Sequence, residues 1–175
     1  MSAPLAKYFV AVLTNKIELL PETIKRLEKY FGKANFTSPW FDFTYTNFYE
    51  KEMGKNLKRC LVSFEKPLPT LLLTKAKKWT TNVEGKFRQA GKRQVNIDAG
   101  YMDFCKVVLA SGKHGGHKIA LTNECFADMI LDYQNGSFHP FAWTFPDFAS
   151  GAYNTPLLKI RTLFKDTIKG PLLTL

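Results

Sequence analysis

The sequence predicts one α+β domain, and three observations lead to this prediction. The chain of 175 residues has the length of a single ordinary domain. Hydrophobic residues make up 45% of it, which is enough for a packed core. Strand-like and helix-like periodicities alternate in the first half, and strand-like segments then follow one another, a pattern typical of helices packed on an antiparallel or mixed sheet. We therefore expect residues 1–175 to form a single domain.

The first strand and the first helix are clearly marked. Residues Leu5–Thr14 are apolar on both alternating faces, which predicts a central strand that is covered on both sides. Apolar residues then recur at helical spacing, with Pro21 suited to the first turn and Gly32 to the end of the helix. The apolar stripe of this helix consists of Leu20, Ile24, Leu27 and Phe31.

The second strand and the second helix follow Asn35–Glu52, an aromatic stretch that fits no element clearly. Residues Leu57–Glu65 alternate as a strand, and an apolar stripe predicts a helix over about Thr70–Ala90. A short strand is expected at Arg93–Asp98, with a turn at Asp98-Ala-Gly100. The stripe of the second helix consists of Leu72, Ala76, Trp79, Val83 and Phe87.

Three further strands and a helix complete the chain. The strands are expected at Lys106–Ala110, His117–Thr122 and Cys125–Tyr133. The last helix is expected to begin at Asn154 or Thr155 and to stop at Gly170-Pro171. If residues 35–52 supply a strand, the first half has a ferredoxin-like βαββαβ order with both helices on one face of the sheet. A β-meander and the C-terminal helix then extend the sheet or cover its other face.

The positive charge of the chain is concentrated in one segment. The formal net charge is +10, and residues 51–93 carry twelve Lys/Arg against three Asp/Glu. On the predicted helix five basic side chains, Lys77 among them, fall outside the apolar stripe and face solvent. Such a surface attracts anions, including nucleic acid, or it only keeps the protein soluble. The side chains that would contact nucleic acid are those of Lys75, Lys78, Lys86 and Arg88.

Composition excludes several classes of protein. No apolar run approaches the roughly 20 residues of a membrane span, and no basic-then-apolar leader opens the chain, so we expect a cytoplasmic protein. The three cysteines are widely spaced, which fits reduced thiols and rules out a disulfide scaffold or a CxxC zinc site. His114 and His117 lack a third ligand at diagnostic spacing, so no metal site is predicted. No pattern names a cofactor or an oligomeric state.

Two irregular segments are rich in aromatic residues. Phe36–Tyr49 and Phe138–Tyr153 together hold thirteen of the 25 aromatic residues. Such residues form the walls of a ligand pocket or stack on bases, or they anchor long loops to the core. Polar residues that packing does not require lie in or beside these segments: Asp42, Thr44, Glu52 and Asp147. A carboxylate among aromatic rings is partly desolvated and can serve as a general acid, although a turn or helix-cap role is the alternative for each.

Two short motifs carry further polar residues. In Asn96-Ile-Asp-Ala-Gly-Tyr101, strand periodicity places Asn96 and Asp98 on one face, where they either position a substrate or cap a turn. The loop Ser111–Lys118 holds three glycines, two lysines and two histidines. It forms either an anion-binding turn or a flexible hairpin loop.

These motifs resemble those of a known family. Their order over nearly the whole chain is Phe41-Asp-Phe-Thr44, Tyr49-x-x-Glu-Met-Gly54, Asn96-Ile-Asp-x-Gly-Tyr101, Lys106-Val-Val-Leu-Ala-Ser111 with Lys113 and His117, and Trp143-Thr-Phe-Pro-Asp147. They are similar to those of the prokaryotic domain-of-unknown-function family 4416. The family is uncharacterised, although some of its members carry the label "GTP-binding protein".

The leading hypothesis is a polar pocket that binds a small anionic ligand, phosphorylated or nucleotide-like. Its expected lining consists of Asp42, Thr44, Tyr49, Glu52, Asn96, Tyr101, Lys113, Trp143 and Asp147. If a reaction is catalysed, Asp98 or His117 would be the acid or base, and Lys106 or Lys113 would stabilise charge. Asp98 and His117 are expected to meet in one cleft. The alternatives are a nucleic-acid-binding module that uses residues 51–93, and a partner-binding scaffold without catalysis.

The sequence lacks the motif with which P-loop proteins bind nucleoside triphosphates. Gly85 and Gly91 are separated by five residues, and Arg93 follows Lys92 where Ser or Thr is required. The segment also ends a predicted helix instead of beginning one. We therefore predict no conventional affinity for GTP. Calorimetric titration with Mg-GTP should detect no micromolar binding, and a clear micromolar affinity would contradict this prediction.

Overall fold

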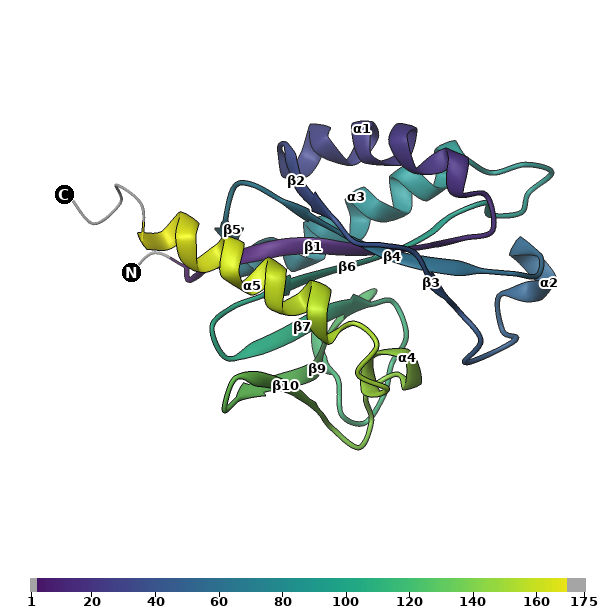
Figure 1. Ribbon diagram of the computed structural model, residues 1–175. Coiled ribbons are helices and arrows are strands. Elements are labelled where there is room, and N and C mark those ends of the chain that lie inside the picture. Colours follow the sequence, from purple (N-terminus) through teal and green to yellow (C-terminus); the bar gives the residue numbers. More distant parts are fainter. Residues whose placement is uncertain (1–2, 170–175) are drawn as a thin grey trace.

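The computed structural model describes residues 3–169 (Figure 1). Its strands form a ten-stranded sheet, in which neighbouring strands run antiparallel. The strands are β1 (Leu5–Thr14), β2 (Ala34–Thr37), β3 (Phe41–Asp42), β4 (Lys58–Phe64), β5 (Leu68–Pro69), β6 (Asn96–Met102), β7 (Lys106–Ser111), β8 (Ile119–Thr122), β9 (Cys125–Gln134) and β10 (Ser137–Pro140). The helices are α1 (Leu20–Phe31), α2 (Glu50–Met53), α3 (Leu73–Lys86), α4 (Pro146–Ala149) and α5 (Asn154–Lys169).

The sheet is built around β1. Its strands follow the order β10-β9-β7-β6-β1-β4-β2, while β3 also pairs with β4, β5 with β1 and β8 with β9. Helices α1 and α3 lie on one face and α5 crosses the other (Figure 1). Tyr8, Val10 and Val12 pack toward α1 and α3, whereas Phe9 and Ala11 pack toward α5, and all five are 0% exposed. The predicted α+β class and the predicted central strand, covered on both sides, are confirmed.

The two long helices of the first layer differ in how well the sequence marks their ends. Helix α1 has Pro21 in its first turn and is followed directly by Gly32, whose φ of 81° is left-handed backbone that glycine adopts without steric cost. Helix α3 ends at Lys86 and not, as predicted, at Ala90. Ala90 and Gly91 have φ values of 48° and 76°. Since an α-helix does not continue through left-handed residues, the chain turns back at this point.

The turn predicted at Asp98-Ala-Gly100 is not formed. These residues lie inside β6, where Asp98 is opposite Ala11 and Gly100 is opposite Phe9 of β1. A Cβ atom at Gly100 would lie 2.5 Å from Leu109 Cδ2 and 2.7 Å from the carbonyl oxygen of Val108 on β7. The glycine is therefore required by the close approach of β7 and not by a turn.

The two aromatic segments contain regular structure that the sequence does not reveal. Phe36–Tyr49 includes the second half of β2 and all of β3, and α2 follows directly; Phe138–Tyr153 includes part of β10 and all of α4. The strand expected at His117–Thr122 begins only at Ile119. The predicted stop of the last helix at Gly170-Pro171 lies outside the described residues. Within residues 3–169, none of the helices has the length and apolar character that crossing a membrane requires.

Lys7 places a charged group inside the fold. Its side chain on β1 is 0% exposed, and Nζ donates a hydrogen bond to the Glu65 carbonyl oxygen at 3.2 Å. Burial lowers the pKa of Lys7 to about 8, and the nearby Glu65 opposes that shift only in part. In an unfolded chain the pKa of lysine is about 10.4. The unfolded state therefore binds more protons between these two values, and the free energy of unfolding rises with pH in this window.

We predict that Lys7→Met removes this pH dependence. Relative to the variant, the wild type should gain up to about 3 kcal/mol of unfolding free energy as the pH rises from about 7 to about 10.4. Near pH 7 the variant should be at least as stable, because methionine carries no charge to bury. Urea unfolding of both proteins at the two ends of this range measures the difference, in which the titration of other groups cancels. Parallel pH profiles of the two proteins would show that Lys7 stays charged in the fold.

Candidate functional site

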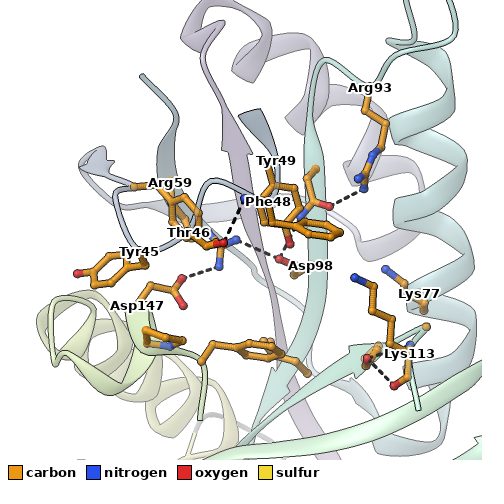
Figure 2. Close-up of a pocket in the computed structure, with 18 of the residues that line it drawn as sticks. Tyr45, Thr46, Phe48, Tyr49, Arg59, Lys77, Arg93, Asp98, Lys113 and Asp147 are labelled. Atoms are coloured by element: carbon orange, nitrogen blue, oxygen red, sulfur yellow. Dashed lines mark hydrogen bonds and ion pairs between the residues drawn. The ribbon is translucent and has the colours of Figure 1, made fainter. Parts of the chain in front are cut away.

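A pocket of about 430 Å³ lies at one end of the central strands of the sheet (Figure 2). This volume is within the range of about 300–1,000 Å³ that is usual for small-molecule sites. Because neighbouring strands are antiparallel, the first residues of β4 and β6 and the last residues of β7 lie at this end of the sheet. The loop before α2, the loop after β7 and the start of α4 enclose the space, and α3 contributes the side chain of Lys77.

Arg59 of β4 is the buried charge of the pocket. Its side chain is only 5% exposed. Nη1 lies 2.7 Å from Asp147 Oδ2, Nη2 lies 3.3 Å from Asp98 Oδ2, and the guanidinium is 4.8 Å from the centre of the Phe43 ring. Burial opposes the charge, but the Asp98 and Asp147 carboxylates outweigh it and raise the pKa of Arg59. The arginine is therefore permanently charged and faces two carboxylates (Figure 2).

Hydrogen bonds extend from this centre in both directions. Asp98 Oδ2 also accepts from Asn96 Nδ2 at 3.1 Å, and Asn96 Oδ1 accepts from Arg93 Nη1 at 2.8 Å. Arg93 donates to both carboxylate oxygens of Glu52, and these hydrogen bonds lower the pKa of Glu52. On the other side, Tyr153 donates to Asp147 Oδ2 at 3.2 Å. The result is one network of side chains: Glu52, Arg93, Asn96, Asp98, Arg59, Asp147 and Tyr153.

Three lysines line the opposite side of the pocket, and they differ in their partners. Lys118 Nζ donates to Ser111 Oγ at 3.0 Å and lies 3.5 Å from Asp128 Oδ2. Lys113 Nζ lies 4.1 Å from the centre of the Phe48 ring. Within residues 3–169, no carboxylate lies within ion-pair distance of Lys113 or Lys77. The amino groups of both point into the pocket (Figure 2), which therefore contains two positive charges that form no ion pair with the described part of the chain.

Aromatic side chains form the remaining wall and the mouth. Phe48 and Tyr49 lie edge to face with their ring centres 5.1 Å apart, and Phe145 faces them from the segment before α4. Phe48 is 61% exposed, so much of its side chain is accessible from outside. Burial and the neighbouring Asp98 raise the pKa of Tyr49, whose hydroxyl stays protonated at neutral pH and can donate a hydrogen bond. Across the mouth, Tyr45 donates to Ser150 Oγ at 3.1 Å and so joins the two aromatic segments.

The structure brings together part of the predicted site. Five of the predicted residues line the pocket: Tyr49, Asn96, Asp98, Lys113 and Asp147. Glu52 lies behind the lining and holds Arg93. Tyr101 is on the same strand as Asp98 but an odd number of residues away, so it faces the opposite side of the sheet and packs 5.8 Å from Tyr8.

The other predicted residues lie elsewhere. Asp42 is exposed and pairs with Lys58, Thr44 is exposed beside it, and Lys106 pairs with Asp103. These polar groups have local partners or solvent, so nothing directs them into the pocket.

His117 and Trp143 form a separate cluster. Their rings stack with centres 5.3 Å apart, and the Trp143 indole N–H donates to the Met129 carbonyl oxygen at 2.9 Å. The carboxylate nearest to His117 is that of buried Asp128, 3.5 Å from Nε2. The predicted pair of Asp98 and His117 is therefore not formed. His114 contacts Phe126, and the described residues contain no group of three metal-ligating side chains.

Sequence reasoning missed four basic residues of the pocket: Arg59, Lys77, Arg93 and Lys118. The best signal is Arg59, a charged residue that strand periodicity places on the same face as Leu61, because a buried strand face tolerates a charge only beside an opposite one. Lys77 was assigned to the solvent-facing side of its helix, since periodicity separates buried from exposed positions but does not show what lies opposite each exposed one.

We predict that Arg59→Met lowers the free energy of unfolding by about 3–5 kcal/mol, because it leaves Asp147 buried without its cation. Lys58→Met is the matched control on the same strand. It removes only the exposed pair with Asp42 and should cost less than about 1 kcal/mol. Denaturant unfolding measures both variants. Similar small losses would mean that the Arg59 ion pairs contribute little.

Comparison with models of protein families matches residues 4–164 to one family, described as "Domain of unknown function (DUF4416)". Comparisons with curated proteins and with solved structures found no match. The matched segment spans most of the chain and agrees with the resemblance of the sequence motifs. The chain therefore belongs to the DUF4416 family.

Proposed function

We propose that the pocket binds a small phosphorylated ligand that carries a planar ring, such as a nucleotide. The observation that carries the proposal is the position of Lys77 and Lys113. Both point into a pocket of about 430 Å³, and neither has a carboxylate partner among residues 3–169. Ammonium groups without partners are strong ligands for phosphate oxygens.

The aromatic wall supports the choice of a ring-bearing ligand. Phe48 and Phe145 are partly exposed at the mouth, and Tyr49 lies between Phe48 and the polar network. Aromatic side chains bind flat rings by offset or edge-to-face contact. Lys113 lies over Phe48, so phosphate and ring would be held close together, as they are in a nucleotide.

The carboxylates offer a third kind of contact. Asp98 and Asp147 each use Oδ2 in the network, and Oδ1 of each has no hydrogen-bond partner within residues 3–169. Neither Oδ1 atom is fully buried, and both residues line the pocket. These oxygens can accept hydrogen bonds from ligand hydroxyl or amino groups. If the ligand undergoes a reaction, Asp98 is the candidate acid or base and Lys113 the candidate charge stabiliser, because His117 and Lys106 do not line the pocket.

We also infer a ferredoxin-like first half and a cytoplasmic location. The strand order β6-β1-β4-β2, with α1 and α3 on one face, supports the first inference. The later strands extend the sheet, but β7 pairs with β9 and not with β8, so consecutive strands are not all neighbours as in a simple meander. The free cysteines Cys60, Cys105 and Cys125 support the second, because thiols persist in a reducing compartment.

The test is a double variant, Lys77→Met with Lys113→Met. Thermal-shift measurements on the wild type should give a stabilising response to at least one of four probes: inorganic phosphate, ribose 5-phosphate, AMP and CMP. We predict that the double variant loses about tenfold in affinity for each lysine removed, since each supplies a charge-assisted contact. The affinity for the responding probe would be measured by calorimetry.

The matched control is Lys55→Met with Lys78→Met, which removes the same charge from exposed positions. Its affinity should stay within about twofold of the wild type, because these lysines do not line the pocket. Failure of all four probes, or equal losses in both double variants, would contradict the proposed function.

A further inference from the structure

A second positively charged site lies on the outer surface of the helical layer. Helices α1 and α3 run side by side (Figure 1), with the Tyr30 and Trp79 rings stacked 5.4 Å apart and Arg26 5.6 Å from the centre of the Phe87 ring. Arg26 precedes Tyr30, whereas Phe87 follows Trp79, so the two helices are antiparallel. Between them is a hollow of about 140 Å³ that is lined by Arg26, Lys29, Tyr30, Asn82, Val83 and Lys86. None of these residues lines the larger pocket.

The rim of this groove is strongly basic. On α3 the exposed residues Lys75, Asn82 and Lys86 follow one another at spacings that place them on one stripe beside Trp79. On α1 the exposed Lys29 faces the same hollow. Within residues 3–169, Lys29, Lys75 and Lys86 have no carboxylate within ion-pair distance. The stripe on α3 extends over about 16 Å, since a helix rises about 1.5 Å per residue.

The carboxylates near the groove do not neutralise it. Glu22 pairs with Arg26 at 2.9 Å. Glu84 on α3 is buried, and its carboxylate accepts from the Ile97 backbone N–H at 2.6 Å, on the sheet side of the helix. The groove therefore keeps a surplus of positive charge along its length.

An aromatic ring is fixed beside these cations. The Tyr30 ring stacks on Trp79 with an angle of 16° between the ring planes, so Trp79 covers one face of the Tyr30 ring. Tyr30 is still 38% exposed, so part of its side chain remains accessible. A basic groove with an ordered aromatic ring is the usual means of binding single-stranded nucleic acid, because the cations follow the backbone and the ring stacks on a base.

We propose that the groove between α1 and α3 binds single-stranded nucleic acid without sequence preference. Lys29, Lys75 and Lys86 contact phosphates, and Tyr30 stacks on a base. The site differs from the one expected from residues 51–93 alone. Helix α1 contributes half of it, Lys77 points instead into the larger pocket, and Arg88 donates to the Gly91 carbonyl oxygen in the turn after α3.

The experiment is fluorescence anisotropy with a labelled oligothymidine of about 20 nucleotides at several KCl concentrations. The groove variant carries Lys29→Glu, Lys75→Glu and Lys86→Glu. It should bind at least about tenfold more weakly than the wild type, and the slope of log affinity against log salt should fall by about two, because a single strand contributes about 0.7 per phosphate contact. The matched control carries Lys51→Glu, Lys55→Glu and Lys159→Glu, which changes the net charge equally at exposed positions elsewhere. Its affinity should stay within about twofold of the wild type.

Stacking is tested separately from charge. Tyr30→Ala should weaken binding about five- to tenfold without changing the salt slope, and Tyr30→Phe should restore the affinity, since it keeps the ring. Circular dichroism and thermal unfolding confirm that each variant is folded before it is titrated.

Three results would overturn the proposal. One is the absence of binding at about 50 mM KCl, where phosphate contacts are strong. Another is an equal loss of affinity in the groove variant and the control variant, which would show that only net charge matters. The third is binding to phosphatidylserine vesicles without binding to the oligonucleotide, which would make the face a membrane-contacting surface instead.

Discussion

The guanidinium of Arg59 joins β4, β6 and α4, three elements that lie far apart along the chain. Its hydrogen bond to Asp147 connects residues separated by 88 positions. A charge taken out of water destabilises the fold by several kcal/mol unless an opposite charge and good geometry offset that cost. Here two carboxylates surround one arginine, so the arrangement is stable only when all three elements are in place. The positions of these charged groups in the pocket are therefore fixed when the protein folds and do not require a ligand.

The cations of the pocket fall into two groups. Arg59, Arg93 and Lys118 face carboxylates of the protein, whereas Lys77 and Lys113 face the open space. The first group gives the pocket its shape, and the second gives it an electrostatic preference. Helix α3 belongs to both surfaces, because Lys77 points into the pocket while Lys86 lines the hollow beside α1. One basic segment of sequence therefore supplies charge to two separate places.

Much of the fold could be predicted from the sequence where one local rule decides the outcome. β1 and α1 are examples, because periodicity, Pro21 and Gly32 all agree. Gly100 shows the limit: a glycine after Asp98 is typical of a turn, but here its small size is required by a neighbouring strand that only the fold brings close. The candidate site divides in the same way. Asn96, Asp98 and Asp147 could be found as polar residues in unusual places, whereas Arg93 and Lys77 could not, since their role depends on which elements lie opposite them.

The hydrogen bond between Tyr45 and Ser150 has a consequence for how fast a ligand enters. It is exposed, and a single hydrogen bond of this kind contributes only about 0.5–1.5 kcal/mol. The segment that carries Ser150 is also held by the ion pair of Arg59 and Asp147, so loss of this hydrogen bond would release only the segment that carries Tyr45. Loops of this kind move on the nanosecond-to-microsecond timescale. If the pocket takes up the proposed anionic ligand, motion this fast would not limit its entry, and the association rate would fall as the ionic strength rises.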